Sequence, residues 1–276
     1  MSGHRMSKKR RYIAWAVAAA AVLVGGGVAA EASIATTVSR PAPKVYTGRA
    51  FDTCAAPSVS AMKAWHTGFY GAAAVYVGGR NRGCAQPNLT ASWVKSVSAT
   101  GWKLIPLYVG AQPPCQTSHN PEKLTASTAA SLGATDGADA VAKASALGMK
   151  AGSPVYLDME SYDVANTSCN NAVLTYVRAW DKAVHAKGYW AGFYGFRSSS
   201  AKAVATATNR TDLPDILWYA LWDEHKTTTT DWPFSTSLWT GHRRGHQYIV
   251  NSKESRGGYS ITVDRSAWDA PVAVTG

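Results

Sequence analysis

Short apolar runs alternate along the chain with longer segments of helical spacing. Runs of β-branched and aromatic residues bounded by Gly, Pro or polar residues are typical of buried strands. Eight such runs occur, at 49–54, 73–78, 103–109, 154–160, 190–196, 215–222, 246–250 and 259–264. Apolar residues three and four positions apart predict five helices between the early runs, at 57–68, 88–100, 136–147, 169–187 and 198–209.

Strands that alternate with helices predict an α/β protein whose parallel sheet is covered on both faces. Eight strands at this length predict a single TIM-type β/α barrel with about five helices. The alternation fails late in the chain, because 223–243 has no helical periodicity. A parallel crossover needs a dozen or more residues, and 251–258 is too short for one. We therefore expect the last strands to lack crossover helices and the eighth strand to be antiparallel.

The stretch SPVYLDMES, residues 153–161, places two acids one residue apart in the fourth strand. Residues i and i+2 of a strand share a face, so Asp158 and Glu160 project together. Asp52 ends the first strand and Asp264 lies in the eighth. Active sites of such barrels lie at the C-terminal strand ends. Neighbouring carboxyl groups whose pKa values differ can supply an acid and a carboxylate, as glycosidic bond hydrolysis requires.

Each acid also has a structural alternative. Asp52 could cap the loop after the first strand. Asp158 and Glu160 could belong to a hydrogen-bonded network with Arg or Tyr. Asp264 could pair with Arg265 or another arginine.

Aromatic residues favour a sugar ligand, since the chain has 11 Trp and 13 Tyr. Tyr108, Tyr156, Tyr194 and Trp222 fall in or beside strand ends, where rings and phenolic hydroxyls suit pyranoses. Any one of these aromatic side chains could equally be core. We expect Trp222, at the end of the sixth strand, to be a sugar platform.

Other chemistries lack their sequence signatures. The chain has no G-x-S-x-G elbow of a serine hydrolase and no H-E-x-x-H of a zinc peptidase. Its cysteines do not have zinc-ligand spacing. We expect neither a metal nor a cofactor.

The N-terminus predicts export. Residues 1–32 combine a basic start, an apolar run and a small-x-small cleavage site, as in a signal peptide; a retained membrane anchor is the alternative. Residues 33–47 read as a linker and 48–272 as the barrel domain. Loss of the leader lowers the net charge from +11 to about +7. Without a Lys/Arg block, this charge disfavours nucleic acid and suits an anionic wall. We expect a secreted, wall-associated monomer that is not inserted in a membrane after cleavage.

Four cysteines in an exported chain predict two disulfides. In the barrel, Cys54 and Cys84 follow the first and second strands, whereas Cys115 and Cys169 follow the third and fourth. Neighbouring strands place each pair on adjacent loops at the C-terminal mouth. We therefore expect Cys54–Cys84 and Cys115–Cys169.

Seven motifs in order resemble a glycoside-hydrolase-like domain of secreted bacterial proteins, itself similar to family 25 lysozymes: GRAFDTCAAPS, AVYVGG, WKLIPLYVGAQPPC, GSPVYLDMESY, GYWAGFYG, HQY and ITVDRS. The resemblance spans about residues 48–270 and implies an eight-stranded barrel with five helices. It implies Glu160 as general acid, Asp158 as the residue that positions or stabilises the sugar, and site roles for Asp52, Gln247 and Asp264.

The expected activity is hydrolysis of a cell-wall glycan such as peptidoglycan. Asp158 could act as a base, or could stabilise an oxocarbenium ion or a neighbouring N-acetyl group, and its spacing from Glu160 does not decide the stereochemical course. Two alternatives are a non-catalytic wall-binding module that retains the cleft and a scaffold that acts through a protein partner.

Overall fold

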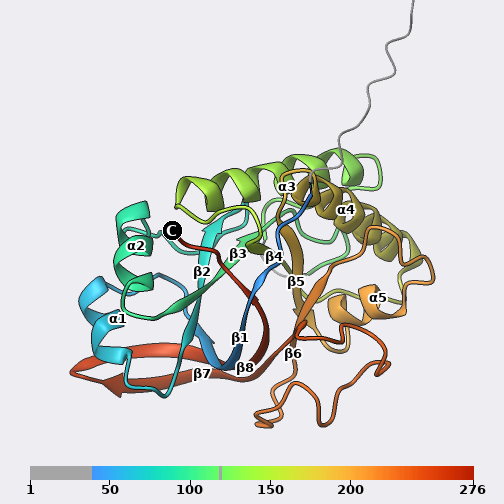
Figure 1. Ribbon diagram of the computed structural model, residues 1–276. Coiled ribbons are helices and arrows are strands. Elements are labelled where there is room, and N and C mark those ends of the chain that lie inside the picture. Colours follow the sequence, from blue (N-terminus) through green and yellow to red (C-terminus); the bar gives the residue numbers. More distant parts are fainter. Residues whose placement is uncertain (1–38, 118–119) are drawn as a thin grey trace, which may run out of the picture. The chain divides into compact units, whose positions relative to one another are not determined.

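The computed structural model describes residues 39–117 and 120–276, and its eight strands close into one barrel (Figure 1). The strands are β1 Lys44–Asp52, β2 Ala72–Gly78, β3 Lys103–Val109, β4 Pro154–Met159, β5 Trp190–Phe196, β6 Ile216–Ala220, β7 Arg244–Arg256 and β8 Tyr259–Val272. The helices are α1 Val59–Trp65, α2 Ala91–Ser98, α3 Ala129–Ala146, α4 Thr167–His185 and α5 Ser200–Thr206. The TIM-type fold with five helices is confirmed.

The closing strand is antiparallel, as its short connection predicts. Strands β1 to β7 pair in parallel in chain order, whereas β8 runs antiparallel to both β7 and β1. The β7–β8 hairpin is much longer than expected, and its far end lies beside α1 (Figure 1). There the Trp65 indole donates to the Tyr259 carbonyl at 3.0 Å.

The predicted linker is wrong at its C-terminal end. Strand β1 begins at Lys44, inside 33–47, because its first residues pair with β8 from Val272 onward. The first residues of β1 are mostly exposed, so they do not need the apolar pattern by which a buried strand is recognised in a sequence. The predicted signal peptide, 1–32, lies outside the described residues.

Two apolar layers hold the fold together. The barrel interior combines small side chains such as Ala50, Ala72 and Ala74 with large ones such as Tyr156 and Trp268. A larger cluster packs the outward faces of the strands against the helices. In most strands alternate residues belong to the two layers, which is the period of two expected for a strand buried on both faces.

The connection between β6 and β7 has no helix, as the absence of periodicity in 223–243 predicts. Its aromatic side chains Trp232 and Phe234 pack edge-on against Tyr219 of β6. His246 of β7 lies with its two ring nitrogens 2.8 Å from the carbonyl oxygens of Thr227 and Leu221. The long loop is therefore anchored to the barrel by aromatic packing and by a buried imidazole.

Both predicted disulfides are confirmed. Cys54 bonds to Cys84 and Cys115 to Cys169, with Cα atoms 5.7 and 5.9 Å apart. Within the described ranges, no helix is long and apolar enough to cross a membrane.

Candidate active site

Strand periodicity gathers the predicted acids at the C-terminal mouth of the barrel. Asp52 stands two residues after Ala50, and Asp158 stands two residues after Tyr156; both reference residues lie in the interior layer. Asp52 and Asp158 are buried, with exposed fractions of 4% and 5%, whereas Glu160, just beyond β4, is half-buried. Asp264 of β8 is the Cα partner of Asp52. The structure therefore brings all four acids together.

Burial makes these carboxyl groups reluctant to ionise. Burial, followed by the charges of Glu160 and Asp52, raises the pKa of Asp158 well above its ordinary value. Burial and then the charge of Asp264 do the same to the pKa of Asp52. Burial also raises the pKa of Glu160 and that of Asp264. Close acids of this kind titrate as a coupled set, an arrangement in which a protonated carboxyl can stand beside an ionised one.

A glutamine that the sequence did not reveal fixes the backbone of the two central acids. The Gln112 side chain, fully buried after β3, donates from Nε2 to the Asp158 carbonyl at 2.9 Å. Its Oε1 accepts from the Glu160 backbone N–H, also at 2.9 Å. One amide thus bridges both backbone groups of the Asp-x-Glu segment and sets the direction in which its carboxyl groups project.

A second glutamine links a carboxylate to two aromatic side chains. Gln247 of β7 donates from Nε2 to Asp52 Oδ2 at 3.0 Å. Its Oε1 accepts from the Tyr194 hydroxyl at 2.9 Å and from the Trp222 indole at 3.1 Å. The structure places Gln247, Tyr194 and Trp222 in one network, and Trp222 is 52% exposed. An exposed indole held by its N–H presents a fixed ring face to solvent.

Tyr76 belongs to the same mouth and was missed by sequence reasoning. It follows Ala72 and Ala74 on the inward face of β2, so its period-two position was the available signal. Tyr76, Asp158 and Glu160 line a cavity of about 240 Å³. Burial, and then the charges of Asp52 and Asp158, raise the pKa of Tyr76 well above its ordinary value, so it remains a hydroxyl donor.

Two predicted sugar-binding tyrosines lie elsewhere. Tyr108 is on the outward face of β3, where its hydroxyl donates to Asp139 Oδ2 of α3 at 3.0 Å. Tyr156 is fully buried in the barrel interior, and its hydroxyl donates to the Pro271 carbonyl at 2.9 Å. A position near a strand end does not show whether a side chain points into the barrel or away from it. In β3, Val109 lines the mouth cavity and its neighbour Tyr108 points outward.

The arginine partner considered for Asp264 binds another acid. Arg265 Nε donates to Glu254 at 2.7 Å, and Arg256 donates to the same carboxylate at 2.6 Å. Asp264 Oδ1 instead accepts from the Asn251 backbone N–H at 2.7 Å. Asp264 thus stays at the mouth with no ion pair in the described part of the chain.

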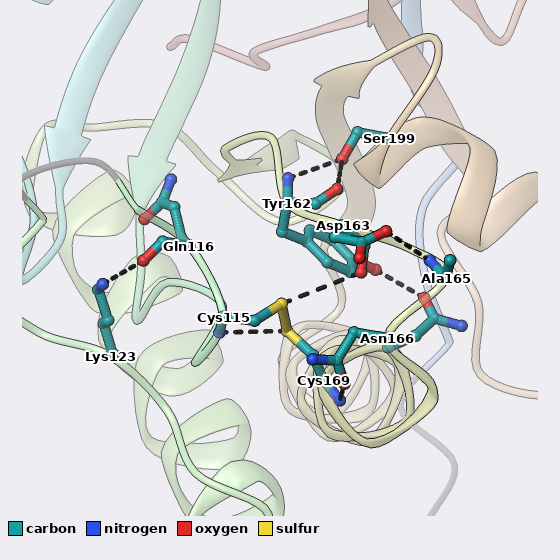
Figure 2. The surroundings of a disulfide bond; sticks show 10 residues. Cys115, Gln116, Lys123, Tyr162, Asp163, Ala165, Asn166, Cys169 and Ser199 are labelled. Carbon is teal, nitrogen blue, oxygen red and sulfur yellow. Dashed lines mark hydrogen bonds between the residues drawn. A yellow bond between two sulfur atoms is a disulfide. The ribbon is translucent and has the colours of Figure 1, made fainter.

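The Cys115–Cys169 disulfide borders the segment that carries Glu160. It joins the loop after β3 to the first turn of α4 (Figure 2). Beside it, the Tyr162 backbone N–H donates to Ser199 Oγ at 2.7 Å, and that hydroxyl donates to the Tyr162 carbonyl at 2.6 Å (Figure 2). The loop after Glu160 is therefore tied to the β5–α5 connection on one side and lies beside a covalent link on the other.

The mouth thus combines buried carboxyl groups of raised pKa with an exposed indole, and these are groups that acid–base chemistry on a sugar can use. Across 39–117 and 120–276, no group of three or more His, Cys, Asp or Glu side chains is arranged to hold a metal ion.

The sequence matches a known family over most of this barrel. Residues 63–268 match the Rv2525c-like, glycoside hydrolase-like domain, and the chain belongs to this family. A comparison with curated proteins gave no match.

Solved structures share the fold at low sequence identity. The Mycobacterium tuberculosis Tat-secreted protein Rv2525c is 17% identical, with a TM-score of 0.54 over 81% of this chain and 96% of that one. An uncharacterized B. stearothermophilus protein is 15% identical, with a TM-score of 0.52 over 80% and 96% of the two chains. A muramidase from Acremonium alcalophilum is 13% identical, with a TM-score of 0.51 over 81% and 94%. These likenesses establish the fold.

Proposed function

We propose that the protein is an exported glycoside hydrolase that cleaves a cell-wall glycan of the peptidoglycan type. One observation carries the proposal: Asp158 and Glu160 project together into the barrel mouth, with raised pKa values, from a backbone fixed by Gln112. Stability gives no reason to keep a buried carboxyl unpaired, and Asp158 Oδ1 has no hydrogen-bond partner among the described residues. It is available to a ligand.

Glu160 is the general acid in this proposal. It is the more accessible of the two acids, so it can reach the oxygen of a glycosidic bond that enters the mouth. Its proton passes to the leaving-group oxygen as the bond from that oxygen to the anomeric carbon breaks. Water then supplies hydroxide to the anomeric carbon and returns the proton to the enzyme.

Asp158 is the second carboxylate. In the free protein, the deeper Asp158 holds a shared proton more strongly, because its burial is more complete than that of Glu160. A bound sugar removes water from Glu160, and positive charge that develops at the anomeric carbon favours ionised Asp158. Both effects place the proton on Glu160 in the transition state.

The aromatic network supplies the sugar contacts. Trp222 offers its exposed ring face to a pyranose, while Tyr76 and Tyr194 offer hydroxyl groups beside the acids. Gln247 is hydrogen-bonded to both the Trp222 indole and Asp52, so the position of the indole relative to the acids is fixed. The family's glycoside hydrolase-like description agrees with this substrate class.

Export is supported by the signal-peptide pattern of residues 1–32 and by the two disulfides. The relative Rv2525c is described as Tat-secreted. We place the protein outside the cell, at the wall whose glycan it cleaves.

The test measures new reducing ends released from purified peptidoglycan. We expect release by the parent protein and a loss of about 10²–10⁴-fold in Glu160→Gln, which cannot donate the proton. The Asp163→Asn variant is the matched control, because it makes the same chemical change three residues away on an exposed acid. It should retain turnover.

Pelleting with the insoluble wall separates hydrolysis from binding. A hydrolase retains wall binding in Glu160→Gln while turnover is lost. Pelleting of both forms without release by either would contradict hydrolysis and favour a non-catalytic wall-binding module.

A further inference from the structure

A cavity of about 490 Å³ lies between the β5–α5 connection and the long β6–β7 loop. One wall carries two cationic side chains, Arg197 and Lys202. The other wall is supplied by Pro233, Phe234 and Leu238 of the loop. No acidic side chain lines it, in contrast to the mouth of the barrel.

The cavity adjoins the candidate active site. Arg197 directly follows β5, and its backbone N–H donates to the Ala220 carbonyl at the end of β6 at 3.0 Å. Its chain neighbour Phe196 packs edge-on against Trp222, with ring centroids 5.8 Å apart. Cavity and platform therefore share the C-terminal rim of β5 and β6.

The two cations are exposed and available. Neither Arg197 nor Lys202 takes part in the ion pairs found across 39–117 and 120–276, whereas Arg80 and Arg265 are each bound to a buried carboxylate. The half-buried Phe234 and Leu238 line the same cavity. The site thus combines positive charge with an apolar surface.

We propose that this cavity is a subsite for the carboxylate-bearing peptide branches of the cell-wall glycan. The inference rests on the proposed function and names its substrate as the peptide-substituted strand. Such peptides combine free carboxylates with small apolar side chains, which match the two walls. A phosphate polymer would use only the two cations, and a neutral glycan would use neither of them.

The experiment measures wall pelleting in the Glu160→Gln background, so that the ligand stays intact. One ligand is peptidoglycan freed of phosphate polymers, and the second is the same insoluble material after carbodiimide-mediated amidation of its peptide carboxylates. We expect the protein to bind the first ligand about tenfold more tightly than the second, from charge-assisted contacts at a solvent-exposed site.

The variant Arg197→Ala/Lys202→Ala should reduce this affinity ratio to about one. The matched control, Lys150→Ala/Lys187→Ala, removes equal charge from loops that precede β4 and β5, at the opposite end of the barrel. It should leave the ratio unchanged. The same substitutions are also made in the parent protein, which retains Glu160. The reducing ends that these variants release provide an independent measurement of hydrolysis.

An unchanged ratio in the Arg197/Lys202 variant would overturn the subsite, as would an equal fall in the control. A preference that appears only with phosphate polymers present would also overturn it, in favour of a polyanion site. If the parent protein shows no turnover but the Arg197/Lys202 variant still lowers the affinity ratio, hydrolysis is refuted and the subsite is supported. If turnover is normal but the affinity ratio does not change in that variant, the subsite is refuted and hydrolysis is supported.

Discussion

Two buried glutamines hold the mouth acids from opposite sides of the barrel. Gln112 fixes the backbone of Asp158 and Glu160, and Gln247 fixes the side chain of Asp52. An amide carries a donor and an acceptor, so each can bridge two unlike groups without adding charge. The amide of Gln247 also lowers the pKa of Asp52 by donating to its carboxylate, which partly offsets the increase caused by burial and by the charge of Asp264.

Replacement of Gln112 by Ala should lower kcat by about 10²-fold with little change in KM, because it removes orientation of the acids rather than sugar contacts. Gln86→Ala is the matched control. That amide bridges the Ala56 N–H and the Cys54 carbonyl at 2.9 and 2.7 Å in a neighbouring loop, outside the Asp-x-Glu segment. Steady-state kinetics of both variants measure kcat and KM. A Gln112→Ala variant with a higher KM but an unchanged kcat would contradict a positioning role.

Asp52→Asn should move the basic limb of the kcat/KM–pH profile to lower pH, because Asp158 is the acid that holds the shared proton more strongly in the free protein. The charge of Asp52 helps to raise the pKa of Asp158. Without that charge the pKa of Asp158 falls, so the ionised form persists at lower pH. Asp264→Asn is the comparison, because the charge of Asp264 acts on the pKa of Asp52 rather than on that of Asp158. A limb that moved to higher pH in Asp52→Asn would refute this coupling.

At the scale of elements, the loops around the mouth are constrained by covalent links as well as by packing. Each disulfide joins the loops of neighbouring strands, and the Cys115–Cys169 link closes 54 residues of chain. The link encloses α3 and β4 and borders the loop after Glu160. Its effect is therefore expected on stability and on the geometry of the acids.

Substitution of both Cys115 and Cys169 by Ser should lower the free energy of unfolding by about 4 kcal/mol through loop-closure entropy. Denaturant unfolding without a reductant measures the loss, and Cys54→Ser/Cys84→Ser is the comparison, since it opens only 30 residues. It should lose slightly less stability. A larger loss for the shorter loop would show that chain entropy does not set the effect.

At the scale of the whole molecule, buried acids outside the site also affect stability. Asp181 of α4 is fully buried, and neither of its carboxyl oxygens has a hydrogen-bond partner among the described residues. Burial, followed by the charges of Asp215 and Asp212, raises the pKa of Asp181 well above its ordinary value. At pH values between the ordinary and the raised pKa, the folded protein binds a proton that the unfolded chain releases, and this costs stability.

Asp181→Asn should raise Tm at pH 7, and its advantage should shrink as pH falls to the ordinary pKa of an aspartate. The native pKa is raised, so the parent loses stability as pH rises, by up to about 1.4 kcal/mol per pH unit. Each kcal/mol corresponds to about 2–4 °C for a domain of this size. Thermal unfolding between pH 4 and 8 measures this, with the exposed Glu224→Gln as control. An advantage that grew toward low pH would contradict the proton-linked cost.

The sequence alone determined much of the architecture. Apolar runs and helical spacing gave the order of strands and helices, and connection length gave the antiparallel eighth strand. Period-two spacing placed Asp158 and Glu160 on one side, and strand order paired the cysteines correctly. These features depend on residues close in sequence or on the topology of neighbouring strands, which local patterns report.

Tertiary structure decided which strand face turns inward and which distant groups meet. Tyr108 lies outside the mouth and Val109 within it, because closure of the barrel sets the rotation of each strand through all its neighbours. Gln112 meets Asp158 across 46 residues, and Arg265 binds Glu254 rather than Asp264. No local pattern encodes these contacts, since each depends on side-chain directions fixed only when the barrel closes.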